Sequence, residues 1–188
     1  MRSFTDGPPD SSNFYCLPGI AGGAFFCTSA SVGGTSILVL VNQDDGRAIR
    51  NKNSVLALYD LMINQKKPEE AAAAFLRHDY IQHNPLIADG SAALGQYFGQ
   101  VTRSHERARV VVHKIMAVGD YVFAHVNFLN LLSDDPTDTG IAGVDIYRFD
   151  EDGKAAEHWD TLQLVGNPSN SAPWVSPNIP RANSQGMF

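Results

Sequence analysis

The sequence predicts an α+β domain in which about three helices pack on one face of a strongly bent, mostly antiparallel sheet. In the first half of the chain, between about residues 54 and 104, apolar residues recur at helical spacing. From Arg107 onward they alternate with polar residues instead, and two turn sequences divide this part into two hairpins. Helices followed by a run of antiparallel strands are typical of this fold class.

Three segments carry helix signals. The first helix is expected to begin near Asn53 or Ser54, either of which could cap it. A short second helix is expected over about 68–77, because its proline suits the first turn and two glutamates follow at the positive end of the helix dipole. The third starts at a cap provided by Asp89 or Ser91 and has apolar residues along one side.

The strand signals lie mainly in the second half of the chain. The sequence YIQHNP, residues 80–85, predicts a short extended piece, because its proline disfavours helix just before it. Two strands are expected to meet at a turn around Gly119, where Gly and Asp favour a hairpin. The second hairpin is expected to join strands 140–149 and 154–165 through Glu-Asp-Gly.

Composition divides the chain into three parts. Residues 1–45 are rich in Gly and Ser and predict a weakly ordered N-terminal extension. Residues 46–166 form the predicted domain, and the Pro-, Ser- and Asn-rich residues 167–188 predict a tail that wraps the domain or a partner. A secretory signal in the extension is the alternative, but a basic start is nearly absent, so we expect a cytoplasmic protein.

The net charge of −6 bears on partners. It argues against a nucleic acid and against an anionic membrane surface, both of which attract a basic face. A small-molecule substrate is the expected partner.

The candidate site lies on the predicted sheet. Asp145 stands in the middle of a strand, where Asp is depleted. His158 and Asp160 are two residues apart on the last strand, so they share a face with about 6.6 Å between their Cα atoms. An imidazole and a carboxylate in an apolar pocket are natural acid/base groups. We therefore predict Asp160, His158 and Asp145 as catalytic, and His83, His125, Asn127 and Tyr147 as substrate-binding residues.

Structural roles are the alternative for the same residues. Asp160 could accept hydrogen bonds from loop amides, and Asp145 could pair with a neighbouring arginine. The histidines could be satisfied within the core or brace a turn.

The sequence contains no spaced metal-ligand motif such as H-x-H or H-E-x-x-H, and the candidate ligands are scattered over separate strands. It also has no phosphate-binding glycine loop, no G-x-S-x-G elbow and no catalytic-cysteine signature. We expect neither a cofactor nor a metal.

Four blocks carry a family resemblance: YIQHNP with the following DG, VGDYVFAH, GVDIYRFDEDGKAAEHWDTLQ, and NSQGMF. Over about residues 52–188 the chain resembles the SnoaL-like polyketide-cyclase group of the NTF2-like superfamily. The resemblance implies a cone-shaped barrel, dimeric through its sheet, with a cavity that holds no cofactor or metal. It further implies an acidic general acid/base for aldol ring closure, which falls on Asp160 with His158 as partner, and polar positions at His83 and Asp145.

Two functions remain open from the sequence. The first is a cofactor-free lyase or isomerase, similar to the aldol cyclases, acting on a small carbonyl-bearing and secondary-metabolite substrate. The second is a non-catalytic module that binds a small hydrophobic ligand or a partner. A homodimer is expected in either case, through an outward sheet face formed by Val122, Ala124, Val126, Phe128 and Trp159.

Overall fold

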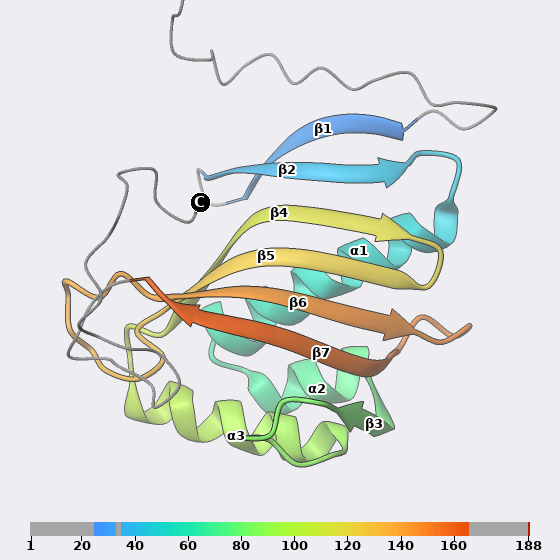
Figure 1. The fold of residues 1–188 in the computed structure, drawn as a ribbon. Helices are drawn as coiled ribbons and strands as arrows, with labels where there is room; N and C mark the ends of the chain where they lie inside the picture. Colours follow the sequence, from blue (N-terminus) through green and yellow to red (C-terminus); the bar gives the residue numbers. More distant parts are fainter. Residues whose placement is uncertain (1–24, 33–34, 166–187) are drawn as a thin grey trace, which may run out of the picture.

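Helices cover one face of a curled seven-stranded sheet (Figure 1). The computed structural model describes residues 25–32, 35–165 and 188, and the side chains of residues 36–165 and 188. The strand order is β1-β2-β4-β5-β6-β7-β3, and the sheet stays open because β1 and β3 form its edges. This confirms the predicted α+β class. Within the described residues, no helix has the length and apolar character needed to cross a membrane.

The first helix begins earlier than predicted. α1 spans Gly46–Tyr59 and continues into a π-helical turn, η1, at Asp60–Asn64. Its cap is Asp45, whose Oδ1 accepts hydrogen bonds from the backbone N–H groups of Arg47 and Ala48. The predicted caps Asn53 and Ser54 therefore lie inside the helix, because a carboxylate two turns upstream already satisfies its first amides.

The second and third helices follow the prediction closely. α2 spans Pro68–Phe75 and runs directly into β3, Leu76–Gln82. α3 spans Ser91–Ser104, but its cap is Gly90 and no side chain accepts from its first amides. Asp89 instead accepts a 2.8 Å hydrogen bond from the N–H of Gln82, so it fixes the end of β3 and not the start of α3.

Both predicted hairpins are present. β4, Arg109–Val118, pairs antiparallel with β5, Tyr121–Leu129, and β6, Ile141–Phe149, with β7, Ala155–Leu164. Gly119 and Gly153 in the two turns have φ of 56° and 80°, values that favour glycine. The two hairpins join through β5 and β6, and β3 pairs parallel with β7 at the edge.

The sheet also includes residues that the sequence analysis assigned to the extension. β1, Phe25–Val32, pairs with β2, Thr35–Asn42, and β2 pairs parallel with β4. Val39 and Val41 are buried in the core. Residues 25–32 and 35–42 thus differ from the expected weak order, since alternate apolar side chains of β2 continue the inner face of the sheet. Residues 1–24, 33–34 and 166 lie outside the described residues, as does the predicted tail over 167–188 apart from Phe188.

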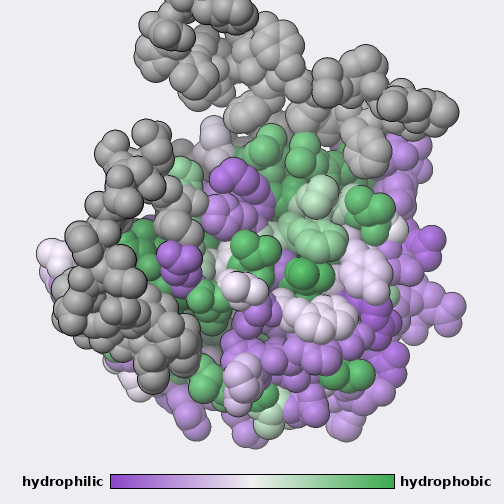
Figure 2. Space-filling model, viewed as in Figure 1, coloured by the Kyte–Doolittle hydropathy of each residue, from purple (hydrophilic) through white to green (hydrophobic). Residues whose placement is uncertain are grey.

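The inner face of the sheet was assigned wrongly for β5. The structure buries Val122, Ala124, Val126 and Phe128 against the helices, where the prediction had them facing outward. Residues paired across neighbouring strands point to the same side, and Ala124 pairs with Asp145. The face that shows apolar side chains to solvent is the opposite one (Figure 2), with exposed Met116, Val118, Tyr121 and Val144.

Candidate functional site

A cavity lies between the helices and the inner face of the sheet. The space that the centre of a water molecule can reach in it is about 80 Å³, and the volume that includes the open solvent at its mouth is about 680 Å³. Its walls are mostly apolar and aromatic and come from α1, η1, the loop after β3, α3 and the sheet. The apolar and aromatic wall residues include Leu58, Met62, Ile63, Leu86, Ile87, Leu94, Tyr97, Phe98, Phe128, Leu131, Ile141 and Leu162.

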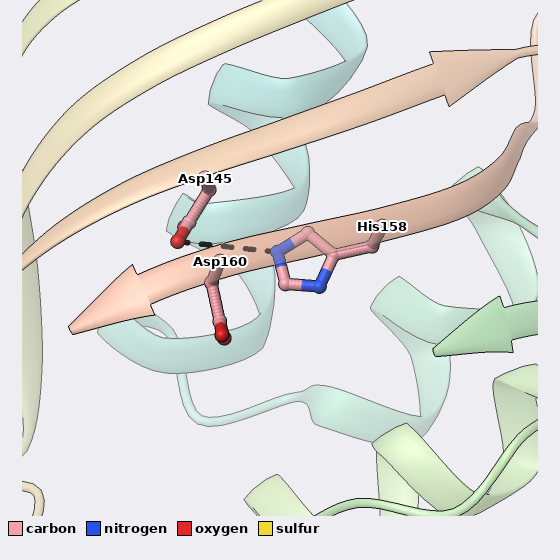
Figure 3. Close-up of side chains that lie close together, drawn as sticks. All are labelled: Asp145, His158 and Asp160. Atoms are coloured by element: carbon pink, nitrogen blue, oxygen red, sulfur yellow. Dashed lines mark ion pairs between the residues drawn. The ribbon is translucent and has the colours of Figure 1, made fainter. Parts of the chain in front are cut away.

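Three ionisable side chains meet at the polar end of this cavity (Figure 3). Asp145 comes from β6, and His158 and Asp160 come from β7. Asp145 and Asp160 are paired directly across the two strands, so both point to the inner face. One potential ligand atom from each of the three side chains lies within 4.8 Å of the others. The structure therefore brings together the three residues that were predicted as catalytic.

His158 is buried, and one of its ring nitrogens is fixed by β3. Its Nδ1 lies 2.9 Å from Oε1 of Gln82, which also accepts from the N–H of Asn84. An amide oxygen can only accept, so Nδ1 carries the proton. The other nitrogen, Nε2, is buried with no hydrogen-bond partner among the described residues and lies 3.9 Å from Oδ1 of Asp145. Nε2 is thus the atom free to exchange a proton.

Asp145 is 2% exposed and is held by a phenol. The hydroxyl of Tyr59, from the end of α1, donates a short hydrogen bond to its Oδ2. Burial and the charge of Asp145 hold the pKa of Tyr59 well above its usual value, so the phenol stays protonated as the donor.

Asp160 is more accessible to the cavity than Asp145. The side-chain amide of Asn84 donates a 2.7 Å hydrogen bond to its Oδ2. Burial raises the pKa of Asp160; the bond from Asn84 and the nearby His158 offset part of this, and the charge of Asp145 raises it again. A carboxylate with a raised pKa is a stronger base than one in water.

Two further tyrosines enclose the imidazole. Tyr147 lies with its ring centroid 4.6 Å from that of His158, and the ring of Tyr80 is stacked at 6.4 Å. Burial raises the pKa of both phenols, and so does the charge of Asp145. Tyr147 was among the predicted site residues, and it lies on the cavity wall.

His83 does not reach the cavity. It is exposed on the other side of the edge strand, where its Nε2 lies 2.9 Å from Oε1 of Glu157 and its ring stacks on Trp159 at 4.8 Å. The prediction chose the wrong member of QHNP, because Asn84, one residue on, turns inward to Asp160.

His125 and Asn127 were also predicted wrongly as cavity residues. His125 points to the outer face, with its Nδ1 3.3 Å from Nζ of Lys114 and its ring near Phe188. Asn127 is buried away from the cavity and donates to the backbone oxygen of Thr139 at 3.2 Å. Both errors arose because the inner and outer faces of β5 were exchanged in the prediction.

Four site residues were missed by the sequence analysis: Tyr59, Tyr80, Gln82 and Asn84. Three of them, Tyr80, Gln82 and Asn84, alternate along β3 and the residues after it. Alternate residues of an extended segment share a face, so the alternation in YIQHNP could have indicated these three as site residues. Tyr59 looked like one more apolar residue of a helix.

The SnoaL-like domain family matches residues 55–158, which is more than half of the chain. The chain belongs to the SnoaL-like family. No curated protein gave a match. The resemblance seen in the sequence is therefore confirmed at the level of the family.

Solved structures share this SnoaL-like fold at low identity. A protein from Bacillus cereus, named as a proposed polyketide cyclase, aligns with a TM-score of 0.56 and 16% identity over 66% of this chain and 83% of its own. A proposed SnoaL-like polyketide cyclase from a Jannaschia species gives 0.53 and 14% over 63% and 88%. An NTF2-like protein of unknown function from Mesorhizobium loti gives 0.52 and 16% over 65% and 98%. These identities establish the fold and leave the reaction open.

Proposed function

We propose that this SnoaL-like protein is an acid/base enzyme, a lyase or isomerase of the aldol-cyclase kind, that acts without a cofactor on a small carbonyl-bearing substrate of secondary metabolism. The observation that carries the proposal is the unpartnered Nε2 of His158, buried between two carboxylates at the end of an apolar cavity. The names of two solved relatives, proposed polyketide cyclases, agree with this chemistry.

The geometry supports distinct roles for the three groups. Asp160, with its raised pKa and one oxygen that has no donor among the described residues, removes a proton from the carbon next to the carbonyl. His158 Nε2, when protonated, donates to the oxygen on which negative charge develops. Asp145 at 3.9 Å stabilises the imidazolium electrostatically.

The non-catalytic alternative is less well supported. A purely structural Asp160 and His158 would be bonded to loop backbone. Instead, Asp160 is hydrogen-bonded to the side chain of Asn84, and His158 to the side chain of Gln82. Asp160 and His158 both line the cavity. A free proton-exchanging atom beside open volume favours catalysis over simple ligand binding.

The proposal can be tested without the natural substrate. 2-Tetralone is a small neutral ketone whose α-protons exchange with D₂O, and the exchange is followed by NMR. We expect the protein to accelerate the exchange and Asp160→Asn to lower the rate by about 10²-fold or more, as for loss of a general base. Asp152→Asn, which removes the same charge on an exposed turn, should have no effect. Equal rates for Asp160→Asn and the parent would refute the role of Asp160.

A further inference from the structure

The charge of the cavity restricts what can bind there. Among the described residues that line it, two are carboxylates, Asp145 and Asp160, one is the imidazole of His158, and none is a lysine or arginine. With both carboxylates ionised, one imidazolium at most offsets them. A carboxylate or phosphate group on a ligand would meet like charge in an apolar surrounding, which is strongly unfavourable.

The polar end of the cavity has hydrogen-bond acceptors that lack a donor among the described residues. One atom of each carboxylate is held from outside the cluster, by Tyr59 and by Asn84. His158 is likewise held through Nδ1, which leaves the buried Nε2 with no hydrogen-bond partner among the described residues. A buried nitrogen without a partner is costly, so a ligand that donates here would gain free energy.

The spacing of the three atoms limits which groups could bind between them. Ligands around a zinc ion at 2.0–2.2 Å lie only about 3–3.5 Å apart. Hydrogen-bond acceptors about 2.8 Å from a tetrahedral nitrogen lie about 4.6 Å apart. Here Nε2 of His158 and Oδ1 of Asp145 are 3.9 Å apart, and all three atoms lie within 4.8 Å. The observed distances lie between the two values and admit either a metal or an ammonium group, so the walls of the cavity have to distinguish the two.

The walls fit an organic cation better than a hydrated ion. The rings of Tyr59, Tyr80 and Tyr147 lie around the cluster, and the rest of the cavity is apolar. Aromatic rings stabilise a cation within about 6 Å of their centres. An apolar body would fill the remainder of the cavity.

We propose that the substrate carries a basic nitrogen, protonated in the cavity, on or beside the carbon that Asp160 deprotonates. Its ammonium group pairs with Asp145, the deepest carboxylate, and a second N–H faces Nε2 of His158, so that the free oxygen of Asp160 stays open to take the C–H proton. This rests on the proposed function, because it takes the same cavity as the reaction site. The positive charge on the neighbouring nitrogen makes the C–H bond more acidic, which suits removal of that proton by a carboxylate.

The test compares three probes with one naphthalene body: 1-naphthylmethylamine, 1-naphthalenemethanol and 1-naphthoate. Binding to the full chain is measured by calorimetry at pH 7. We expect the amine to bind at least about 10-fold more tightly than the alcohol, and the naphthoate more weakly than both. Asp145→Asn and Asp160→Asn should each weaken the amine about 10-fold or more and leave the alcohol unchanged, whereas Asp152→Asn should change neither.

Several results would overturn the proposal. These are an alcohol that binds as tightly as the amine, a preference for naphthoate, or no amine binding at 1 mM on the parent protein. Tight binding of Zn²⁺ or Mn²⁺ alone that Asp145→Asn abolishes would assign the cluster to a metal. The parent comparison stands even where a variant fails to fold. Exchange of 2-tetralone, a neutral ketone, tests the acid/base function separately, so either idea can fail without the other.

Discussion

Oε1 of Gln82 lies 2.9 Å from Nδ1 of His158, so a residue at the sheet edge decides which nitrogen of the imidazole is free. The two strands β3 and β7 run parallel here, and Gln82 and His158 are paired across them. The hydrogen bond directs Nε2 toward the two carboxylates. Gln82 is therefore a positioning residue for the acid/base group.

Replacing Gln82 tests this arrangement. Gln82→Met keeps the length of the side chain and removes the acceptor, which frees the ring and leaves the N–H of Asn84 without its partner. We expect α-proton exchange of 2-tetralone to fall by about 10–100-fold, with a changed pH profile. Gln100→Met on the exposed side of α3 is the control. An unchanged rate and pH profile would show that Gln82 does not position the imidazole.

Asp160 predicts a pH-dependent stability. The fold raises its pKa above the reference value of 3.8, so the folded protein binds this proton more tightly than the unfolded chain. The contribution of Asp160 to the free energy of unfolding therefore falls as the pH rises from 3.8 toward the pKa in the folded protein. Asp160→Asn, which keeps the acceptor for Asn84, should melt at a higher temperature than the parent at pH 7, and the difference should vanish near pH 3. A lower melting temperature at pH 7 would contradict this, and Asp152→Asn should show no such trend.

Tyr59 predicts a cost in stability. Tyr59→Phe removes the hydrogen bond to Asp145, a carboxylate that is 2% exposed. The loss should lower the free energy of unfolding in urea by about 1–3 kcal/mol, because a buried acceptor loses its donor. Ser104→Ala, which removes an exposed hydroxyl at the end of α3, is the control and should change it little. Equal stabilities for the two variants would mean that the carboxylate finds another donor.

The helices and hairpins could be predicted from the sequence, but the direction of each strand face could not. Alternation shows which residues share a face. In β5, however, Phe123 and Val122 make both faces apolar, and nothing local says which one is inside. The pairing decides it: Asp145 lies opposite Ala124, so His125 must point outward. Pairing between distant strands is a tertiary property, and one wrong choice of face misplaced His125 and Asn127.

The same limit applies to β2, whose partner β4 lies far along the chain. Val41 is 1% exposed on the inner face, and its neighbour Leu40 is half-buried on the other. Val41→Ala should lower the free energy of unfolding by about 1–3 kcal/mol, and Leu40→Ala by less, because only the first leaves a hole in the core. If both variants lost only a little free energy of unfolding, β2 would be a dispensable extension and not part of the core.

The outer face of the sheet predicts a dimer. Its exposed apolar residues, Met116, Val118, Tyr121 and Val144, lie together on the central strands, and we propose that two copies of the chain cover this face mutually. Sedimentation should give about twice the 20.4 kDa of one chain. Val144→Arg places a charge within the contact and should shift the protein to monomer, because a buried unpaired charge is costly. Ala92→Arg, at an exposed position on α3, should leave the mass unchanged. A parent protein that sediments as a single chain at micromolar concentration would show that this face stays uncovered.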